Sequence, residues 1–310
     1  MSNSSYTIRN YQPPDFEKYA QLHLEVEKLE PTGRYPSPQT LSENLHRPNY
    51  SPEQDLFIVE TAGNIAGYIN VAPELITERV ILDCLIHPEH RKKGLASKLL
   101  GCAMHRAKEL KVKVARVNIP QDNAAAKSVL SKLGFRFVRR FLRMGLDTAE
   151  LRGQEATKTL LHYRHLKHGE EDKLTEIQNR SFAGTWEYNP NTVEEIGYRI
   201  NSINCSPEEV VLACERDKVV GYCWTRIICE EKAATGERKG HIRMLGVDPD
   251  YQRRRIGKGV LLAGLSYIKS KDLQVAELDV DSSNKAAYTL YQSVGFKVRD
   301  SSLWYEKAVD

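Results

Sequence analysis

Long hydrophobic runs are missing from this 310-residue chain. No apolar stretch approaches the roughly 18 residues that a membrane helix needs, so a spanning helix is not expected. The opening residues, MSNSSYTIRNYQPPDF, lack the apolar core of a secretory signal peptide. The six cysteines form no C-x-x-C pair, which disfavours a metal site or a disulfide framework. We therefore expect a cytoplasmic protein with reduced thiols and no bound metal.

A strong excess of one charge is also missing. The chain has 45 Lys and Arg against 41 Asp and Glu, a net charge of +4. The longest arginine run, Arg253 to Arg255, has three members and no aromatic residues between them. Nucleic-acid-binding proteins usually show a denser basic surface, so neither a nucleic acid nor a membrane is an expected partner. We expect a monomer or a homodimer.

The chain contains an internal repeat. HPEHRKKGLASKLL in the first half corresponds to DPDYQRRRIGKGVL in the second. Pro88 and Pro249 are 161 positions apart, and Asn123 and Asn284 have the same offset. Such a constant offset predicts two structural copies. The second copy has a longer segment around 229–240, which is a natural place for substrate contacts specific to that copy.

Both copies predict the same elements in the same order. Antiparallel strands precede a strand–helix–strand–helix unit, and a final hairpin is expected from Gly134-Phe135 and from Gly295-Phe296. The pattern implies an α+β fold, with a mixed, mostly antiparallel sheet flanked by helices. We expect domains at 1–147 and 158–310, joined by a polar segment. The expected helices cover 14–29, 38–46 and 94–110 in the first copy and 170–182, 191–203 and 256–271 in the second.

A glycine-containing turn between a strand and a helix occurs once in each copy, as RKKGLA at 91–96 and QRRRIG at 252–257. Backbone N–H groups of such a turn point toward one place, and the helix dipole adds positive character. Each turn therefore predicts an anion site. Arg255 stands where the first copy has Gly94, and it would be strained by about 1 kcal/mol if the turn requires positive φ.

The two copies resemble domains of the GCN5-related N-acetyltransferase (GNAT) family, which carries an R/Q-x-x-G-x-G/A turn and an N-x-x-A-x-x-x-Y-x-x-x-G-F segment. The tandem layout resembles the mycothiol synthases of that family. The resemblance implies acetyl-CoA as co-substrate, with its pantetheine arm along a strand and its pyrophosphate on the turn. The implied contacts are Leu245, Gly246, Val247, Gln252, Arg253, Arg254, Arg255, Ile256, Gly257, Lys258, Asn284 and Ala287 in the second copy. In the first copy they are Cys84, Leu85, Ile86, Arg91, Lys92, Lys93, Gly94, Leu95, Ala96 and Asn123.

The acid that protonates the departing thiolate is a tyrosine in that family, and the matching residue here is Tyr291. A phenol with a pKa around 10 is a competent acid for this step. The first copy has Leu130 at this position, so we expect the C-terminal domain to be catalytic and the N-terminal domain to be degenerate. Tyr288 is the alternative acid, and a packing role for Tyr291 is the non-catalytic alternative. The first copy could still bind acetyl-CoA unproductively, or serve as a structural partner.

The general base is sought six residues before Val247, where mycothiol synthase-like sequences have a glutamate and this chain has His241. A histidine can accept a proton near neutral pH. Strand alternation predicts His241, Arg243, Leu245 and Val247 on one face. Val80 is the expected counterpart of His241 in the first copy. The alternative bases are Glu231, Glu237, Asp279 and Asp281.

The resemblance implies acetyl transfer to a primary amine of a small molecule, directly within a ternary complex. Two alternatives remain open at the level of sequence. The acceptor could be a protein N-terminus or lysine, or the chain could bind acetyl-CoA without catalysing a reaction.

Overall fold

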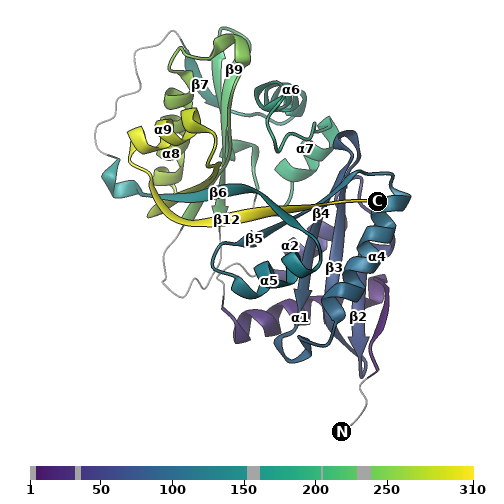
Figure 1. Ribbon diagram of the computed structural model, residues 1–310. Coiled ribbons are helices and arrows are strands. Elements are labelled where there is room, and N and C mark those ends of the chain that lie inside the picture. The colour runs from purple at the N-terminus through teal and green to yellow at the C-terminus, as the bar shows by residue number, and fades with distance from the viewer. Residues whose placement is uncertain (1–4, 32–35, 152–160, 204, 229–238) are drawn as a thin grey trace. The chain divides into compact units, whose positions relative to one another are not determined.

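The computed structural model describes residues 5–31, 36–151, 161–203, 205–228 and 239–310. The chain forms two compact units (Figure 1). Unit 1 comprises Met1–Arg139 and Leu303–Asp310, and unit 2 comprises Arg140–Ser302. Each unit therefore contains a piece of chain from the other half of the sequence.

Unit 1 has the sheet order β1-β2-β3-β4-β5, followed by the C-terminal part of β12. β4 and β5 are parallel, whereas β1 to β4 pair antiparallel in sequence order. Its elements are β1 (Thr7–Asn10), α1 (Phe16–Leu29), α2 (Pro38–Leu45), α3 (Pro52–Asp55), β2 (Leu56–Thr61), β3 (Asn64–Glu74), β4 (Arg79–Ile86), α4 (Leu95–Glu109), β5 (Val114–Pro120), α5 (Ala124–Lys132) and the start of β6 (Arg136–Asp147).

Unit 2 repeats this plan with the sheet order β6-β11-β10-β9-β8-β7. β10 and β11 are parallel, and the neighbouring pairs are antiparallel. Its elements are β7 (His162–His165), α6 (Glu171–Phe182), α7 (Val193–Ile200), β8 (Val210–Glu215), β9 (Lys218–Ile228), β10 (Lys239–Val247), α8 (Ile256–Ser270), β11 (Val275–Asp281), α9 (Lys285–Val294) and the start of β12 (Lys297–Ala308). The predicted mixed α+β class is confirmed.

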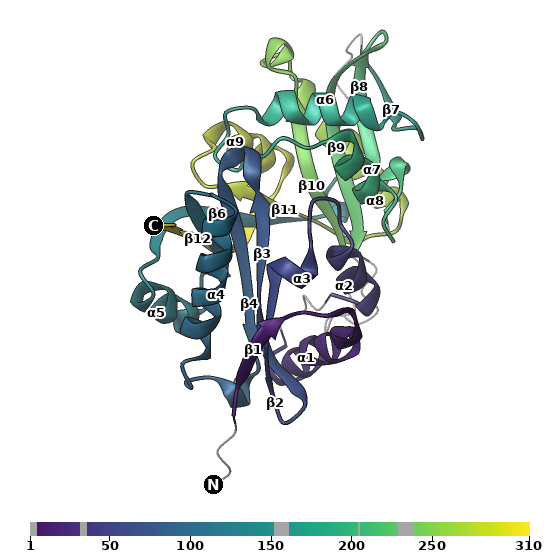
Figure 2. The ribbon, with the colours of Figure 1, turned by 90° about the vertical axis from the view of Figure 1, so that its right-hand side faces the viewer.

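Helices cover both faces of each sheet. In unit 1, α4 covers one face, where its Leu99 shares a core with Leu82 of β4, and α1 and α2 cover the other, where Leu22 of α1 shares a core with Ile58 of β2 (Figure 2). In unit 2, α8 and α9 cover one face, and α6 and α7 cover the other (Figure 1). We call the latter the α7 face.

The expected final hairpin is wrong in both copies. Each copy ends instead in one 12-residue strand, β6 or β12. The later part of β6 pairs with β11 in unit 2, and Leu146 lies in that unit's core with 1% exposure. The last part of β12 returns to unit 1, where Leu303 is buried and the Val309 N–H donates to the Lys113 carbonyl. The two compact units therefore do not coincide with two contiguous halves of the sequence that meet near residue 147.

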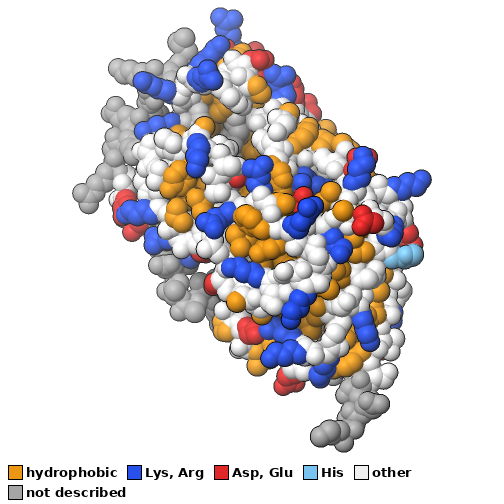
Figure 3. Space-filling view, in the orientation of Figure 1, with side chains coloured by type: hydrophobic (Ala, Val, Ile, Leu, Met, Phe, Trp, Pro, Cys, Tyr) orange, Lys and Arg blue, Asp and Glu red, His pale blue; other side chains and the backbone are white. Residues whose placement is uncertain are grey.

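The six predicted helices are present, with ends set by local chemistry. α2 begins at a proline after Ser37, whose side chain accepts from the Thr40 N–H. α7 begins with a capping box between Thr192 and Glu195. Among the described residues, no helix is both long and apolar enough to cross a membrane. On the face seen in Figure 3, Lys and Arg side chains are scattered among other types.

Candidate active site

The two parallel strands at the centre of unit 2 pair over only half of their length. Lys239–Ile242 of β10 pairs with Val275–Leu278 of β11, and their ladder ends there. β10 continues to Val247 with β9 as its partner. Unit 1 repeats this geometry, since β4 and β5 pair only from Arg79 to Leu82. The backbone edge of Leu245–Val247, and of Cys84–Ile86, therefore faces away from the ladder. That is where the resemblance implies the pantetheine arm.

A β-bulge interrupts β10 just where the ladder ends. Ile242 pairs with Thr225 of β9, but Met244 pairs with Trp224, so Arg243 is an extra residue. β4 pairs with β3 without a shift of register. The bulge is therefore a feature of the second copy that the first copy lacks, and it bends the strand beside the gap.

The bulge overturns one expectation about side-chain direction. Ile242, Leu245 and Val247 all pack in the core under α8 and α9. His241 precedes Ile242 and therefore points to the α7 face, where Arg243 lies with its guanidinium carbon 5.5 Å from the Trp224 ring centroid. His241 and Arg243 thus do not share a face with Leu245 and Val247, because the inserted residue reverses the alternation.

The bulge also changes which residue of the first copy corresponds to His241. Arg79 and Lys239 start the two parallel ladders, an offset of 160 rather than 161. By this structural register His241 corresponds to Ile81, and the sequence alignment with Val80 is wrong. Ile81 cannot accept a proton, and neither can Val80. The first copy therefore still lacks a base at the position of His241.

The two turns have the same backbone conformation. Lys92 and Gly94 have φ values of 60° and 76°, and Arg253 and Arg255 both have φ values of 63°. The residues between them, Lys93 and Arg254, are not among the positive-φ positions. Alternating signs of φ make consecutive N–H groups converge on one point, as in anion-binding nests. Arg255 therefore does occupy the left-handed region, and the strained alternative is the correct one.

The cations of the two turns differ in their partners. Both terminal nitrogens of Arg91 donate to Glu30 at 2.7 Å, and Lys93 Nζ donates to Tyr6 at 2.9 Å. In the second copy, Arg253 and Arg255 make no side-chain hydrogen bond or ion pair within the described residues. The charges of the second turn are therefore available to an incoming anion, whereas Glu30 already partly neutralises the first turn.

Other predicted contact residues lie at the same places in both copies. Asn123 and Asn284 cap α5 and α9, each accepting from the N–H three residues on. Leu95 and Ile256 open α4 and α8 with buried side chains, so they offer a ligand only backbone groups. Arg254 stacks over the Tyr251 ring at 4.9 Å. The remaining contact residues take these positions: Gln252 ends the short helical turn before Arg253, Gly257 and Lys258 lie in the first turn of α8, Ala96 in that of α4, and Ala287 in that of α9.

Tyr291 lies on α9 against the same core as Leu245 and Val247. Its side chain is 7% exposed, and its ring meets Phe296 edge to face with centroids 5.9 Å apart. Its hydroxyl has no hydrogen-bond partner among the described residues. Burial raises the pKa of Tyr291 above its ordinary value. The phenol therefore keeps its proton near neutral pH, and its hydroxyl can serve a ligand.

His241 belongs to a charged network on the opposite face. Its Nε2 lies 3.3 Å from Asp279 Oδ2 on β11, and Arg143 Nε donates to Asp279 Oδ1 at 3.3 Å. Burial would raise the pKa of Asp279, but the hydrogen bond with His241 and the charge of Arg143 outweigh it and lower that pKa. Arg143 lies on β6, so a residue encoded in the first half supports the candidate base in unit 2.

The alternative acid and bases fare differently. Tyr288 already accepts a hydrogen bond from Gln292 at 3.0 Å. Asp281 accepts from Ser283 in the turn before α9, whereas Asp279 is the partner of His241. Glu231 and Glu237 lie outside the described residues, as does most of the lengthened segment at 229–240.

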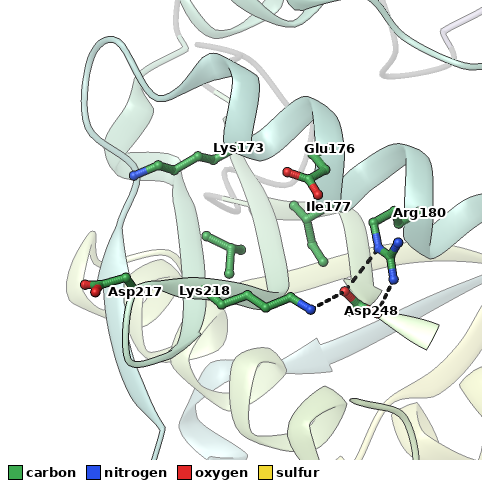
Figure 4. Close-up of a pocket in the computed structure, with 8 residues that line it drawn as sticks. Lys173, Glu176, Ile177, Arg180, Asp217, Lys218 and Asp248 are labelled. Carbon is green, nitrogen blue, oxygen red and sulfur yellow. Dashed lines mark hydrogen bonds and ion pairs between the residues drawn. The ribbon is translucent and has the colours of Figure 1, made fainter. Parts of the chain in front are cut away.

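A pocket of about 180 Å³ lies where β10 ends, between α6 and the β8–β9 hairpin (Figure 4). At its floor, Arg180 donates to both oxygens of Asp248, which is 1% exposed, and Lys218 lies 3.7 Å from the same carboxylate. Figure 4 shows both cations directed at Asp248. This network ties α6 to the start of the anion turn, and neither Tyr291 nor His241 lines the pocket.

The repeat, the diverging strands and the paired turns agree with a comparison against family models. The model described as "Acetyltransferase (GNAT) family" matches residues 18–135 and 172–296, one stretch in each copy. The chain belongs to this acetyltransferase family. As a GNAT protein with two family matches, it is a tandem acetyltransferase and hence an acyltransferase enzyme.

Curated relatives carry the name mycothiol acetyltransferase. The protein from Stackebrandtia nassauensis is 30% identical over 261 residues, which are 83% of each chain. The one from Streptomyces coelicolor is 26% identical and covers 97% of this chain and 98% of its own. The tandem GNAT protein from the clavulanic acid biosynthesis pathway has a TM-score of 0.74, with 14% identity and 99% coverage of both chains. This last similarity concerns the fold alone.

Sequence reasoning missed the features that distinguish the two copies most sharply. A comparison of the two sequence copies does not reveal that Arg243 is an inserted residue, because the segments after it align without a gap. The offset of Gly67 to Gly221, 154 positions against 161 later on, showed that length had been added, but it pointed to the following loop. Arg143 gave no signal, because its role depends on the exchange of β6.

Proposed function

We propose that unit 2 transfers an acetyl group from acetyl-CoA to a primary amine of a small molecule. One observation supports this choice of unit most directly. The bulge beside the diverging strands, a Tyr291 hydroxyl without a partner among the described residues, and the His241–Asp279 pair occur together in the second copy. The first copy has an unbroken strand, Leu130 and Ile81 at the corresponding positions. The mycothiol acetyltransferase relatives support a small-molecule acceptor.

The residues of unit 2 suit binding of acetyl-CoA. The convergent amides at 252–258 and the side chains of Arg253 and Arg255, which have no ion-pair partner in the described part of the chain, would hold the pyrophosphate. The open edge of Leu245–Val247 would pair with the pantetheine amides. Gly246 leaves no room for a side chain, since a Cβ there would lie 2.5 Å from the Tyr222 ring and 2.7 Å from Ser181 Cβ. Tyr222 and Ser181 therefore pack closely against β10 at Gly246, on the α7 face.

The candidate base and acid lie on opposite faces of one sheet, next to the gap between β10 and β11. His241, oriented by Asp279, would take the proton of the attacking amine on the α7 face. A backbone N–H at the open edge of β10 would stabilise the negative charge that builds on the acetyl oxygen. Tyr291 would give its proton to the departing thiolate on the other face. The new amide and a free thiol are the products, and solvent restores both protonation states.

The cysteines near the site favour direct transfer of the acetyl group from acetyl-CoA to the amine over transfer through a cysteine. Leu245 stands on the strand where the first copy has Cys84, so this position offers no nucleophile. Cys223 on β9 is fully buried, and burial raises the pKa of its thiol to about 12. A thiol so rarely ionised is a poor nucleophile, which disfavours an acetylated cysteine intermediate.

The test is release of the CoA thiol from acetyl-CoA with a panel of acceptors. The panel holds amino acids, amino sugars, cysteinyl amines, a lysine-containing peptide and a peptide with a free N-terminus. We expect turnover with at least one small amine, and loss of turnover in Tyr291→Phe. Turnover with peptides alone would overturn the acceptor class. Binding of CoA without turnover of any acceptor would contradict catalysis by unit 2 and would assign it a role in binding CoA.

A further inference from the structure

Three arginines lie together on the α7 face of unit 2, beside the candidate base. We call Arg199 of α7, Arg226 of β9 and Arg243 of β10 the arginine cluster. Arg226 is the direct Cα partner of His241 across the β9–β10 ladder. Arg243 is the bulge residue and stacks over Trp224. Arg199 extends from α7, and its Nη1 donates to Asn191 Oδ1 at 2.9 Å.

The positive charges of Arg226 and Arg243 are poorly balanced. Within the described residues, neither Arg226 nor Arg243 lies within ion-pair distance of a carboxylate. The acid that acts on both is Glu209, which is 3% exposed and accepts from the Ile227 N–H at 3.0 Å. Burial raises the pKa of Glu209, which makes it a weak counter-ion.

The unbalanced positive charge affects the pKa of Arg243. Burial, together with repulsion by Arg199 and Arg226, lowers the pKa of Arg243 to about 10. Buried charges in proteins are usually paired, because an unpaired one loses its hydration without compensation. Arg226 and Arg243 have no carboxylate within ion-pair distance among the described residues and lie next to a reactive group, which is the arrangement expected of an anion-binding subsite.

Arg226 and Arg243 are specific to the second copy. Ala72 faces Ile81 in unit 1 at the position where Arg226 faces His241 in unit 2. Arg243 is the inserted residue and has no counterpart. A shared structural need would have kept these charges in both copies. Their appearance together with the base and the bulge ties them to the chemistry of unit 2.

We propose that the arginine cluster binds an anionic group, a carboxylate or a phosphate, on the amine acceptor. This proposal rests on the proposed function of unit 2 and adds the charge of its substrate. The acceptor's anion would lie between Arg226 and Arg243, and its amine would face His241. Guanidinium groups suit this role because they donate paired hydrogen bonds to planar or tetrahedral oxyanions.

The kinetic test compares acceptors that differ only in the anion. Suitable pairs are an amino acid with its primary amide, and glucosamine 6-phosphate with glucosamine. We expect the anionic member of at least one pair to have the lower KM in the wild type. Arg226→Ala, which restores the first copy's residue, and Arg243→Gln should raise that KM about 10- to 100-fold and raise the KM of the neutral member far less. Arg216→Gln, an exposed turn residue, controls for net charge.

The carboxylate and phosphate pairs identify which oxyanion the cluster prefers. Neutral acceptors used as well as anionic ones, with no effect of either variant on the difference, would overturn the proposal. Arg243→Lys separates charge from packing. It should recover part of the affinity if the charge matters, and none if the residue only stacks on Trp224.

A binding experiment keeps this result separate from the proposed function. With CoA at saturation, so that the anion turn is filled, inorganic phosphate should raise the Tm of the wild type. The rise should disappear in Arg226→Ala and Arg243→Gln, measured against each variant's own Tm without phosphate. An unchanged rise in both variants would contradict the subsite. Phosphate binding that depends on the arginines, in a protein that acetylates nothing, would keep the subsite and reject the acetyl transfer.

Discussion

His241 and Asp279 face each other across two parallel strands, with Nε2 and Oδ2 3.3 Å apart. Asp279→Asn keeps the shape of this pair and removes the charge. We expect kcat to fall by at least about 10-fold while the KM for acetyl-CoA stays constant, because the imidazole loses the group that orients it. Thiol-release kinetics measures both. Asp281→Asn is the matched control, and a larger loss in that control would move the base to the end of β11.

The state of the imidazole gives a second readout for this pair. If Asp279 accepts from Nε2–H, Nδ1 is the nitrogen free to take the amine proton. ¹⁵N chemical shifts of His241 should then show a protonated Nε2 in the neutral wild-type ring. A mixture of tautomers in Asp279→Asn, with one tautomer in the wild type, fits a positioning role. The same mixture in both proteins would show that the contact orients nothing.

Tyr291→Phe removes a hydroxyl that has no partner among the described residues, so the fold should tolerate it well. We expect kcat to fall by about 100-fold or more through loss of the acid, with little change in CoA affinity. Calorimetric titration of CoA and steady-state rates give the two quantities. Tyr288→Phe is the control one helical turn away. Unchanged kcat in Tyr291→Phe would assign the tyrosine to packing.

Arg255 and Gly94 allow a paired test of backbone strain. Both residues have positive φ, and a Cβ at Gly94 would meet nothing within 4 Å. Arg255→Gly should therefore raise the free energy of unfolding by about 1 kcal/mol, and Gly94→Ala should lower it by a similar amount. Denaturant titration of both variants measures the effect. Equal and small changes in the two would mean that φ at this turn carries no cost.

Leu303 and Leu146 test the exchange of strands. Each lies in the core of the unit to which the other half of the sequence contributes it, with exposures of 6% and 1%. Leu303→Ala and Leu146→Ala should each cost about 2 to 5 kcal/mol. Hydrogen exchange should show the loss of protection in unit 1 for Leu303→Ala and in unit 2 for Leu146→Ala. The reverse assignment would contradict the exchange.

The acid stability of unit 2 should depend on Asp248. The hydrogen bonds from Arg180 hold the pKa of this carboxyl below the value of about 3.9 in an unfolded chain. Its contribution is therefore complete above pH 5 and is lost as the pH falls through the folded pKa. Unfolding at pH 3 and pH 7 should show a smaller pH difference in Asp248→Asn than in the wild type. Asp250→Asn, which removes the exposed partner of Arg180, should retain more of that difference.

The sequence was sufficient for the fold class, the helices and the presence of two copies, because periodicity and a constant offset are local signals. It could not show that Arg243 is an inserted residue, since a bulge depends on the partner strand. The faces assigned to His241 and Leu245 were wrong for that reason. The sequence also could not predict the exchange of β6 and β12 between the units, because both strands follow Gly-Phe turns that predict an ordinary hairpin.

The central claim, that the second copy carries out the transfer, is tested most directly by reversing one charge in each turn. Lys92 and Arg253 are equivalent, both with positive φ at the same step of the turn. The measurement is the rate of CoA thiol release at varied acetyl-CoA. We predict that Arg253→Glu raises the KM for acetyl-CoA by at least about 10-fold, while Lys92→Glu keeps KM and kcat within about twofold. Loss of activity in Lys92→Glu with an active Arg253→Glu would contradict the account.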